Sequence, residues 1–213
     1  IRRSEASKHL AELKKRVEAL DRKVSGGSVS LEESEKLWEE FQNYFYGKFM
    51  AFNKSLPGNM REGRAFSYST ELSEPLFIAN FVASRNESMR SGQRLVRQLE
   101  EKVASGTATR AELADLEDQK SYIELQKKQI AGGLAVFLIR KYMYRDDVYK
   151  TIFSKEKQLV VQVDQIQHDL IEAFGLNFFM KEFLSQLKDV FRQYEILFQA
   201  ADLEAHEIGR AHV

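Results

Sequence analysis

Apolar residues recur at intervals of three and four along most of the chain. The clearest run lies between residues 4 and 24, where the apolar positions are Leu10, Leu13, Val17, Leu20 and Val24. This 3-4-3-4 spacing is typical of an amphipathic or coiled-coil helix. No stretch shows the strict alternation of apolar and polar residues that indicates a β-strand. The pattern therefore predicts an all-α protein.

Breakers between the periodic stretches divide the chain into helical segments. The expected ranges are 4–24, 31–54, 73–104, 109 to beyond 130, 134–153, 155–174 and 177–205. The pair Gly132-Gly133 is expected to interrupt the pattern, through a kink or a close helix crossing, because a glycine inside a helix costs up to about 1 kcal/mol against alanine. An unbroken helix over 73–104 would be about 46 Å long, which predicts an elongated bundle.

Two similar stretches, 24–33 and 103–112, carry the same local signals. In each, an apolar seam meets glycine, at Gly26-Gly27 and at Gly106, and glycine suits the left-handed residue that ends a helix. Ser30-x-x-Glu33 and Thr109-x-x-Glu112 then match the capping box that begins a new helix. These signals predict two antiparallel helical hairpins, at about 5–54 and about 73–131. Duplication and convergence both explain the repeat, and capping chemistry alone accounts for most of it.

The rest of the chain is assigned around these hairpins. We expect one all-helical domain over residues 1–213, partly coiled-coil-like, with C-terminal helices at about 134–205 packed alongside the hairpins. A segment at 56–70 lacks helical periodicity and contains Pro57, Gly58 and Gly63. Connections of this length without regular structure are uncommon and often functional, although a linker whose aromatic residues pack on the bundle is an equal interpretation.

Charge and composition narrow the class of partner. Lysine and arginine number 32, as do aspartate and glutamate, so the basic excess of a nucleic-acid-binding protein is missing. The chain has no cysteine, which leaves the compartment open between cytoplasm and periplasm. The strongest apolar run, 134–139, is far shorter than the roughly 20 residues that span a bilayer. We therefore expect a soluble protein that does not bind nucleic acid.

The first helix is basic and the start of the second is acidic. Residues 1–24 hold Arg2, Arg3, Lys8, Lys14, Lys15, Arg16, Arg22 and Lys23. The acidic start contains Glu32, Glu33, Glu35, Glu39 and Glu40. We expect these two runs to lie beside each other in the N-terminal hairpin and to set its register.

Candidate catalytic and metal chemistry is sparse. Asp164, His168 and Glu172 share one face of a helix at i, i+4 and i+8. The outer two lie about 12 Å apart along the axis, so one ion cannot bind all three. No phosphate-binding glycine loop and no Glu-x-x-His pair on matched helices is found. We predict no catalytic residue, no metal site and no cofactor, and an enzyme that uses carboxylates ranks last.

The chemistry that remains is that of protein binding. The segment 56–70 carries Arg61, Arg64, Phe66 and Tyr68, and the helix before it carries Tyr44, Tyr46 and Phe49. Aromatic residues and arginine are enriched in the cores of interfaces, although a core helix contacted on two sides is the preferred explanation of the second group. These seven residues are the predicted contacts of a protein partner, whose identity the sequence leaves open, and a homo-oligomer is a second candidate state.

The predicted function is a non-enzymatic interaction module, a scaffold or adaptor component of a larger assembly. A bacterial secretion or cell-envelope assembly is one setting that suits such a shape. The alternative is a helical effector or ligand-binding protein that acts at a membrane surface. In that alternative the working element would be 134–149, which is apolar and carries Arg140, Lys141 and Arg145.

Overall fold

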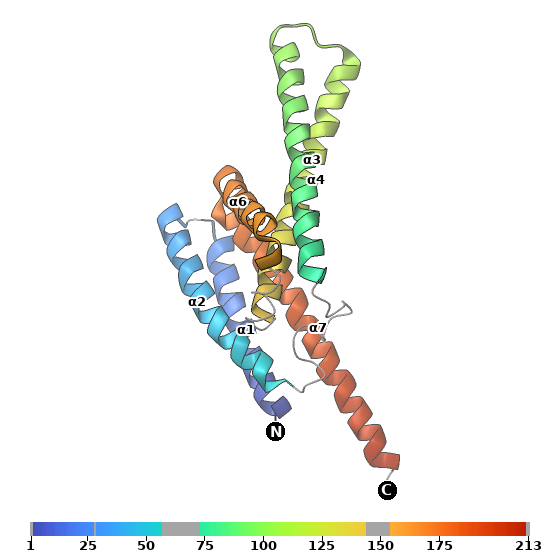
Figure 1. The fold of residues 1–213 in the computed structure, drawn as a ribbon. Coiled ribbons are helices and arrows are strands. Elements are labelled where there is room, and N and C mark those ends of the chain that lie inside the picture. The colour runs from blue at the N-terminus through green and yellow to red at the C-terminus, as the bar shows by residue number, and fades with distance from the viewer. Residues whose placement is uncertain (1, 28, 57–72, 144–153, 212–213) are drawn as a thin grey trace.

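The protein is an elongated bundle of α-helices (Figure 1). The computed structural model describes residues 2–27, 29–56, 73–143 and 154–211, and this part of the chain contains no strand. Its helices are α1 (Arg2–Ser25), α2 (Leu31–Ser55), α3 (Ser73–Ala104), α4 (Arg110–Met143), α6 (Lys157–Phe174) and α7 (Leu176–Ala211). The all-α class and the antiparallel hairpins predicted from periodicity are confirmed.

The predicted stops and caps lie where the sequence places them. Gly27, Gly106 and Gly175 have positive φ angles of 80°, 73° and 97°, a conformation that residues with a side chain adopt only at a cost. The Ser30 hydroxyl accepts a hydrogen bond from the Glu33 amide at 3.2 Å and begins α2. Local hydrogen bonding therefore fixes both hairpin turns before any tertiary contact is considered.

One prediction about helix boundaries is wrong. Gly132 and Gly133 do not interrupt the helix, because α4 continues through them from Arg110 to Met143. The close crossing that was the other expectation is present: a Cβ atom at Gly133 would lie 2.8 Å from Val82 Cγ2 on α3. The glycines thus allow two helices to approach each other rather than ending one of them.

The aromatic part of the core lies between α2 and α7, which run in the same direction. Trp38 on α2 packs edge-on against Phe179 and Phe183 on α7, with ring centroids 5.6 Å and 5.2 Å apart. Further along, Phe52 packs edge-on against Tyr194 at 4.8 Å. Edge-to-face pairs of this kind add about 0.5–1.5 kcal/mol each beyond the apolar area that they bury. The seam of α1 is buried as predicted, and it packs into the same core.

The ion pairs of α1 differ from the predicted arrangement. In the described residues, Lys14 pairs with Glu195 and Asp21 with Lys188, both on α7. Between α1 and α2, the described ion pair joins an acidic residue of α1 to a basic residue of α2, the reverse of the prediction. Glu12 on α1 lies 3.6 Å from Lys48 on α2. The basic run of α1 faces α7 as well as α2, and sequence order alone does not reveal that third helix.

The α3–α4 hairpin projects from the bundle. Figure 1 shows its outer part extending beyond α6, while its base lies against α6 and α7. At the base, Arg90 pairs with Asp169 of α6 at 3.2 Å. The Lys127 ammonium lies 4.6 Å from the ring centroid of Phe174 and 4.5 Å from that of Phe178, at the turn between α6 and α7. These contacts fix the direction in which the hairpin leaves the body.

Candidate partner-binding groove

An apolar groove lies where the projecting hairpin meets the body. Its walls come from α3 and α4, and Gln186 of α7 closes one side. The apolar and small residues that line it are Phe77, Ile78, Phe81, Gly132, Gly133 and Val136. The groove encloses about 490 Å³, and the Phe77 side chain at its edge is 73% exposed. Such exposure is costly for a phenyl ring, so the groove is a candidate docking site.

Two adjacent glycines in α4 form the floor of this groove. A Cβ atom on Gly133 would clash with Val82, whereas the nearest atom to a Cβ on Gly132 would be Gln186 Nε2 at 3.5 Å. Gly133 is therefore required for the α3–α4 crossing, and Gly132 leaves open depth in the groove. A glycine in a helix interior costs up to about 1 kcal/mol against alanine. The close packing against Val82 offsets this cost at Gly133, whereas no close contact offsets it at Gly132.

A second groove follows the first toward the tip of the hairpin. It encloses about 510 Å³ between α3 and α4. Its lining residues from α3 are Ser84, Glu87, Ser88, Ser91, Gly92 and Leu95, and those from α4 are Gln119 and Tyr122. On α3 the two grooves follow one helical stripe, since Phe77, Phe81, Ser84, Ser88, Ser91 and Leu95 are spaced by three or four residues. The two grooves therefore open on the same side of the hairpin.

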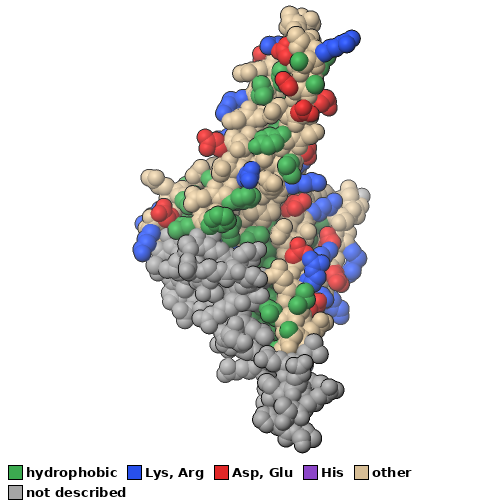
Figure 2. Space-filling model, turned by 90° about the vertical axis from the view of Figure 1, so that its right-hand side faces the viewer, with side chains coloured by type: hydrophobic (Ala, Val, Ile, Leu, Met, Phe, Trp, Pro, Cys, Tyr) green, Lys and Arg blue, Asp and Glu red, His purple; other side chains and the backbone are tan. Residues whose placement is uncertain are grey.

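Figure 2 shows one face of this arm. Apolar side chains are spaced along the hairpin and gather toward the body, beside residues drawn in grey. Among the large apolar side chains exposed on α3 and α4 are Phe77, Leu95, Val103, Leu113, Tyr122 and Leu125. The contrast with the first hairpin is direct: Val24 is 2% exposed, whereas Val103 at the equivalent place is 43% exposed. The second hairpin has the same apolar spacing as the first, but fewer helices pack against it, so more of its apolar side chains are exposed.

Basic groups lie on the rim at the base of the groove. The Arg85 guanidinium lies 5.2 Å from the centroid of the Phe81 ring, a cation–π contact. Lys128 lines the groove and is exposed. Neither side chain has a carboxylate partner within the described residues. The base of the groove is therefore apolar in its interior and positive at its edge.

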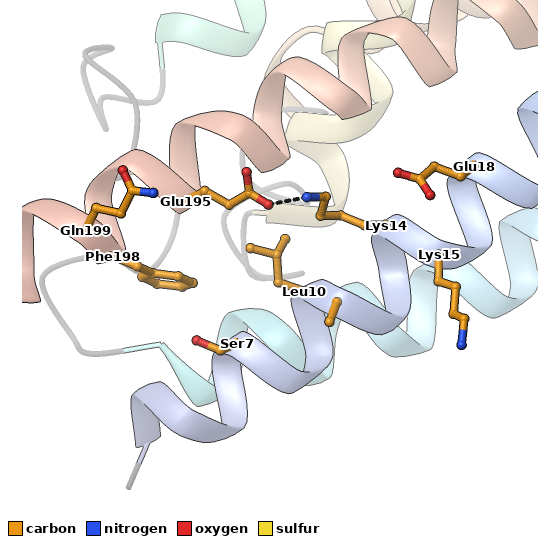
Figure 3. A pocket seen from close by; sticks show the side chains of 9 residues that line it. Ser7, Leu10, Lys14, Lys15, Glu18, Glu195, Phe198 and Gln199 are labelled. Atoms are coloured by element: carbon orange, nitrogen blue, oxygen red, sulfur yellow. Dashed lines mark hydrogen bonds and ion pairs between the residues drawn. The ribbon is translucent and has the colours of Figure 1, made fainter.

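Another cleft lies between α1 and α7 (Figure 3). It encloses about 550 Å³, and the Lys14–Glu195 ion pair crosses it. Figure 3 shows Leu10 and Phe198 below that pair, while Lys15 points away from it. Because charges of both signs line this cleft and already pair across it, we interpret it as a helix–helix contact rather than a docking site.

The structure describes three of the seven predicted contact residues, and all three lie on α2. Phe49 is fully buried between Phe45 and Phe52, so it belongs to the core and not to an accessible site. Tyr44 is half-buried, with the Arg16 guanidinium 5.0 Å from its ring centroid, and Tyr46 is 44% exposed. Arg61, Arg64, Phe66 and Tyr68 lie outside the described residues, and so does most of the segment 56–70. Leu56 caps α2 and is buried.

Groups that could carry chemistry are separated from the groove. His168 Nε2 lies 3.5 Å from Glu172, and both side chains are largely exposed. Within residues 2–27, 29–56, 73–143 and 154–211, no three histidine, aspartate or glutamate side chains are close enough to share a metal ion. Burial raises the pKa of the Tyr194 hydroxyl, and the charge of the buried Arg140 acts in the opposite direction. Tyr194 therefore stays neutral in the core.

The membrane alternative depended on residues 134–149. In the described part of this segment Leu134, Phe137, Ile139 and Arg140 are buried in the bundle. None of the helices, over the residues that the structure describes, combines the length and the apolar character needed to cross a bilayer. Lys141 is exposed, and Arg145 lies outside the described residues.

Comparison with known proteins gives no relative from which function can be transferred. No protein-family model, no curated protein and no solved structure matches this chain. The only support for this candidate site is therefore the geometry of the groove itself. Two signals for it were present in the sequence: the adjacent glycines at 132–133, and the cluster of large apolar residues at 76–82 that opens the third helix.

Proposed function

We propose that this protein is a non-enzymatic interaction module, a scaffold or adaptor, that docks a partner protein along the α3–α4 hairpin. The observation that carries the proposal is the exposed apolar groove at the base of the arm, with Phe77 at its edge. Interface cores combine aromatic and aliphatic anchors with a polar rim, and this groove has both. A bacterial secretion or envelope assembly remains one setting for such a module.

The arm is suited to this role because its exposed part does not depend on the core of the body. A partner can pack along α3 and α4 while the α2–α7 aromatic core stays intact. Docking on helices rather than loops also presents the anchors in a fixed geometry, which lowers the entropy lost on binding.

Site-specific photo-crosslinking tests the proposal. A benzophenone amino acid replaces Phe77 in the full chain, and the protein is irradiated in extract from the cells that produce it. A matched probe at Gly47, which is exposed on α2 with no atom within 4 Å of a Cβ, serves as the control. We expect a protein adduct from position 77 and none from position 47. Adducts of equal yield from both positions, or from neither, would reject the proposal.

A second candidate function is the binding of a small apolar ligand. The groove volume of about 490 Å³ lies within the range of roughly 300–1,000 Å³ that is usual for small-molecule sites. A ligand from the same extract that remains bound during native mass spectrometry, and is lost in Gly132→Leu, would favour this candidate over protein docking.

A further inference from the structure

The two grooves on the hairpin form one trough suited to a third helix. From Phe77 to Leu95 the stripe on α3 advances by 18 residues, or about 27 Å at 1.5 Å per residue. Small side chains occupy its middle, because Ser84, Ser88 and Ser91 lie between the apolar residues at the two ends. Small residues let a neighbouring helix approach closely, and an antiparallel helix pair with one open side is two thirds of a three-helix bundle.

The anchors are arranged as helix-in-groove recognition requires. Phe77 and Phe81 line one wall at the base, and Val136 lies on the other. Leu95 and Tyr122 repeat this arrangement of two walls nearer the tip. A docked helix meets such a trough with residues at i, i+3 or i+4, and i+7, so an apolar stripe on one face is sufficient. Its opposite face stays in water.

The cations on the rim at the base favour an acidic partner there, whereas Glu87 lines the groove nearer the tip. Arg85 and Lys128 flank the base without a carboxylate partner among the described residues. Lys127 beside them is held by Glu124 at 3.5 Å and by the two phenyl rings of Phe174 and Phe178, so it is already compensated. A docked helix with Asp or Glu beside its apolar stripe would supply the missing charges. A helix flanked by lysine would be repelled at the same place.

We infer that the trough binds an amphipathic α-helix of about 18 residues whose apolar stripe is flanked by acidic residues. This inference deepens the proposed function and rests on it, because it names the kind of partner that the arm docks. The three observations that carry it are the length of the trough, the small residues in its middle, and two cations at its base that have no carboxylate partner among the described residues.

Peptide binding to the full chain tests the inference directly. Two fluorescent 18-residue peptides share leucines at i, i+3 and i+4 spacing. One carries glutamate beside the leucines and the other carries lysine. We expect fluorescence anisotropy at low salt to show the glutamate peptide binding at least about tenfold more tightly, a difference of about 1.4 kcal/mol. Equal affinity of the two peptides, or no binding of the glutamate peptide, would overturn the inference.

Matched variants show whether binding occurs in the trough. Gly132→Leu fills the groove, whereas Gly47→Leu adds the same side chain to an exposed helical site with open space around it. Lys128→Glu reverses one rim charge, and Lys36→Glu reverses an exposed charge on α2. We expect the Gly132 variant to weaken binding by at least about tenfold and the Lys128 variant to remove the preference for glutamate. Unchanged binding in both, with thermal melts like those of their controls, would place the peptide elsewhere.

Two other possible occupants of the trough, a second copy of the chain and a lipid surface, would give different experimental results. If sedimentation shows a dimer that Gly132→Leu dissociates and Gly47→Leu does not, the occupant is a second copy of the chain, and the inference is wrong. If vesicles of anionic lipid bind the protein through Lys128 more tightly than the glutamate peptide does, the occupant is a lipid surface, and the inference is again wrong.

Competition separates the inference from the proposed function. The glutamate peptide is added to the crosslinking reaction with the probe at position 77. We expect the partner adduct to disappear. An adduct that persists in excess peptide would overturn the acidic-helix inference and leave the proposed function standing. The absence of any adduct would reject the proposed function itself.

Discussion

Gly133 lies against Val82 so closely that a Cβ atom on the glycine would be 2.8 Å from Val82 Cγ2. Val82 is fully buried, and its β-branched side chain has little freedom to move. This contact sets the crossing of α3 and α4 at the base of the arm, and it determines the shape of the groove beside it.

The neighbouring glycines should respond to alanine with opposite signs. We expect Gly133→Ala to lower the free energy of unfolding by about 1 kcal/mol or more, because overpacking of a filled core exceeds the gain in helix propensity. Gly132→Ala has room for its methyl group and should raise stability by about 0.5–1 kcal/mol. Urea denaturation followed by the fluorescence of Trp38, the single tryptophan, measures both. Equal effects of the two substitutions would show that the crossing is not limited by Val82.

The hairpin tip is held by a reciprocal capping box. The Glu112 amide donates to Thr109 Oγ1, and the Thr109 amide donates to Glu112 Oε1, both at 3.1 Å. We expect Thr109→Ala to cost about 1 kcal/mol of local stability. Hydrogen exchange should become faster in the first turn of α4 and stay unchanged in α2. Faster exchange spread evenly over all helices would contradict a local role.

The same cap should depend on pH. The hydrogen bond from the Lys102 ammonium, followed by that from the Thr109 amide, holds the pKa of Glu112 below its ordinary value. Because the folded pKa is the lower one, the contribution is fully present above the ordinary carboxylate pKa of about 4.3 and is lost as pH falls through the folded pKa. Tip protection corrected for intrinsic exchange should therefore decrease in acid, and Glu112→Gln should remove this dependence. Glu101→Gln, an exposed change on α3, should retain it.

Tyr194 should affect stability in alkali. Burial raises its pKa above the ordinary tyrosine value of about 10, so its contribution is present below that value and is lost as pH rises through the folded pKa. We expect the urea midpoint of the wild type to decrease between pH 8 and pH 10.5 more than that of Tyr194→Phe. A Tyr46→Phe control removes an exposed hydroxyl and should follow the wild type. Parallel decreases in all three proteins would show that Tyr194 does not contribute.

Two phenylalanines should differ strongly when each is replaced by alanine. Phe183 packs edge-on against Trp38, Phe41 and Phe45, and its loss should cost about 3–5 kcal/mol. Phe77 is mostly exposed, and its replacement should change stability by about 0.5 kcal/mol or less. Thermal denaturation followed by circular dichroism measures both. A large loss at Phe77 would mean that the groove edge is part of the folded core rather than a free surface.

Local signals made the helices predictable. The 3-4 spacing of α1, the hydroxyl caps at Ser30 and Thr109, and the glycine stops all act within a few residues, so the sequence alone reveals them. The sequence alone does not show which apolar stripe is covered by another helix. Phe49 and Phe77 both lie on amphipathic helices, yet the first is buried in the core and the second is mostly exposed.

The groove was missed for the same reason. Phe77 and Val136 are far apart in sequence and meet only because the hairpin folds back, and Gln186 arrives from a third helix. The interruption predicted at Gly132-Gly133 had a correct physical basis, the cost of glycine in a helix. What compensates that cost is a contact with Val82, and this contact is visible only in three dimensions.

The outer part of the α3–α4 arm projects beyond the other helices in Figure 1, and this makes its reach adjustable. Removing seven residues from each helix above the upper groove would keep the apolar seam in phase and bring the Gly106 turn about 10 Å closer to the body. The grooves below would not change. Evolution or design can therefore set how far the arm extends independently of the shape of its grooves.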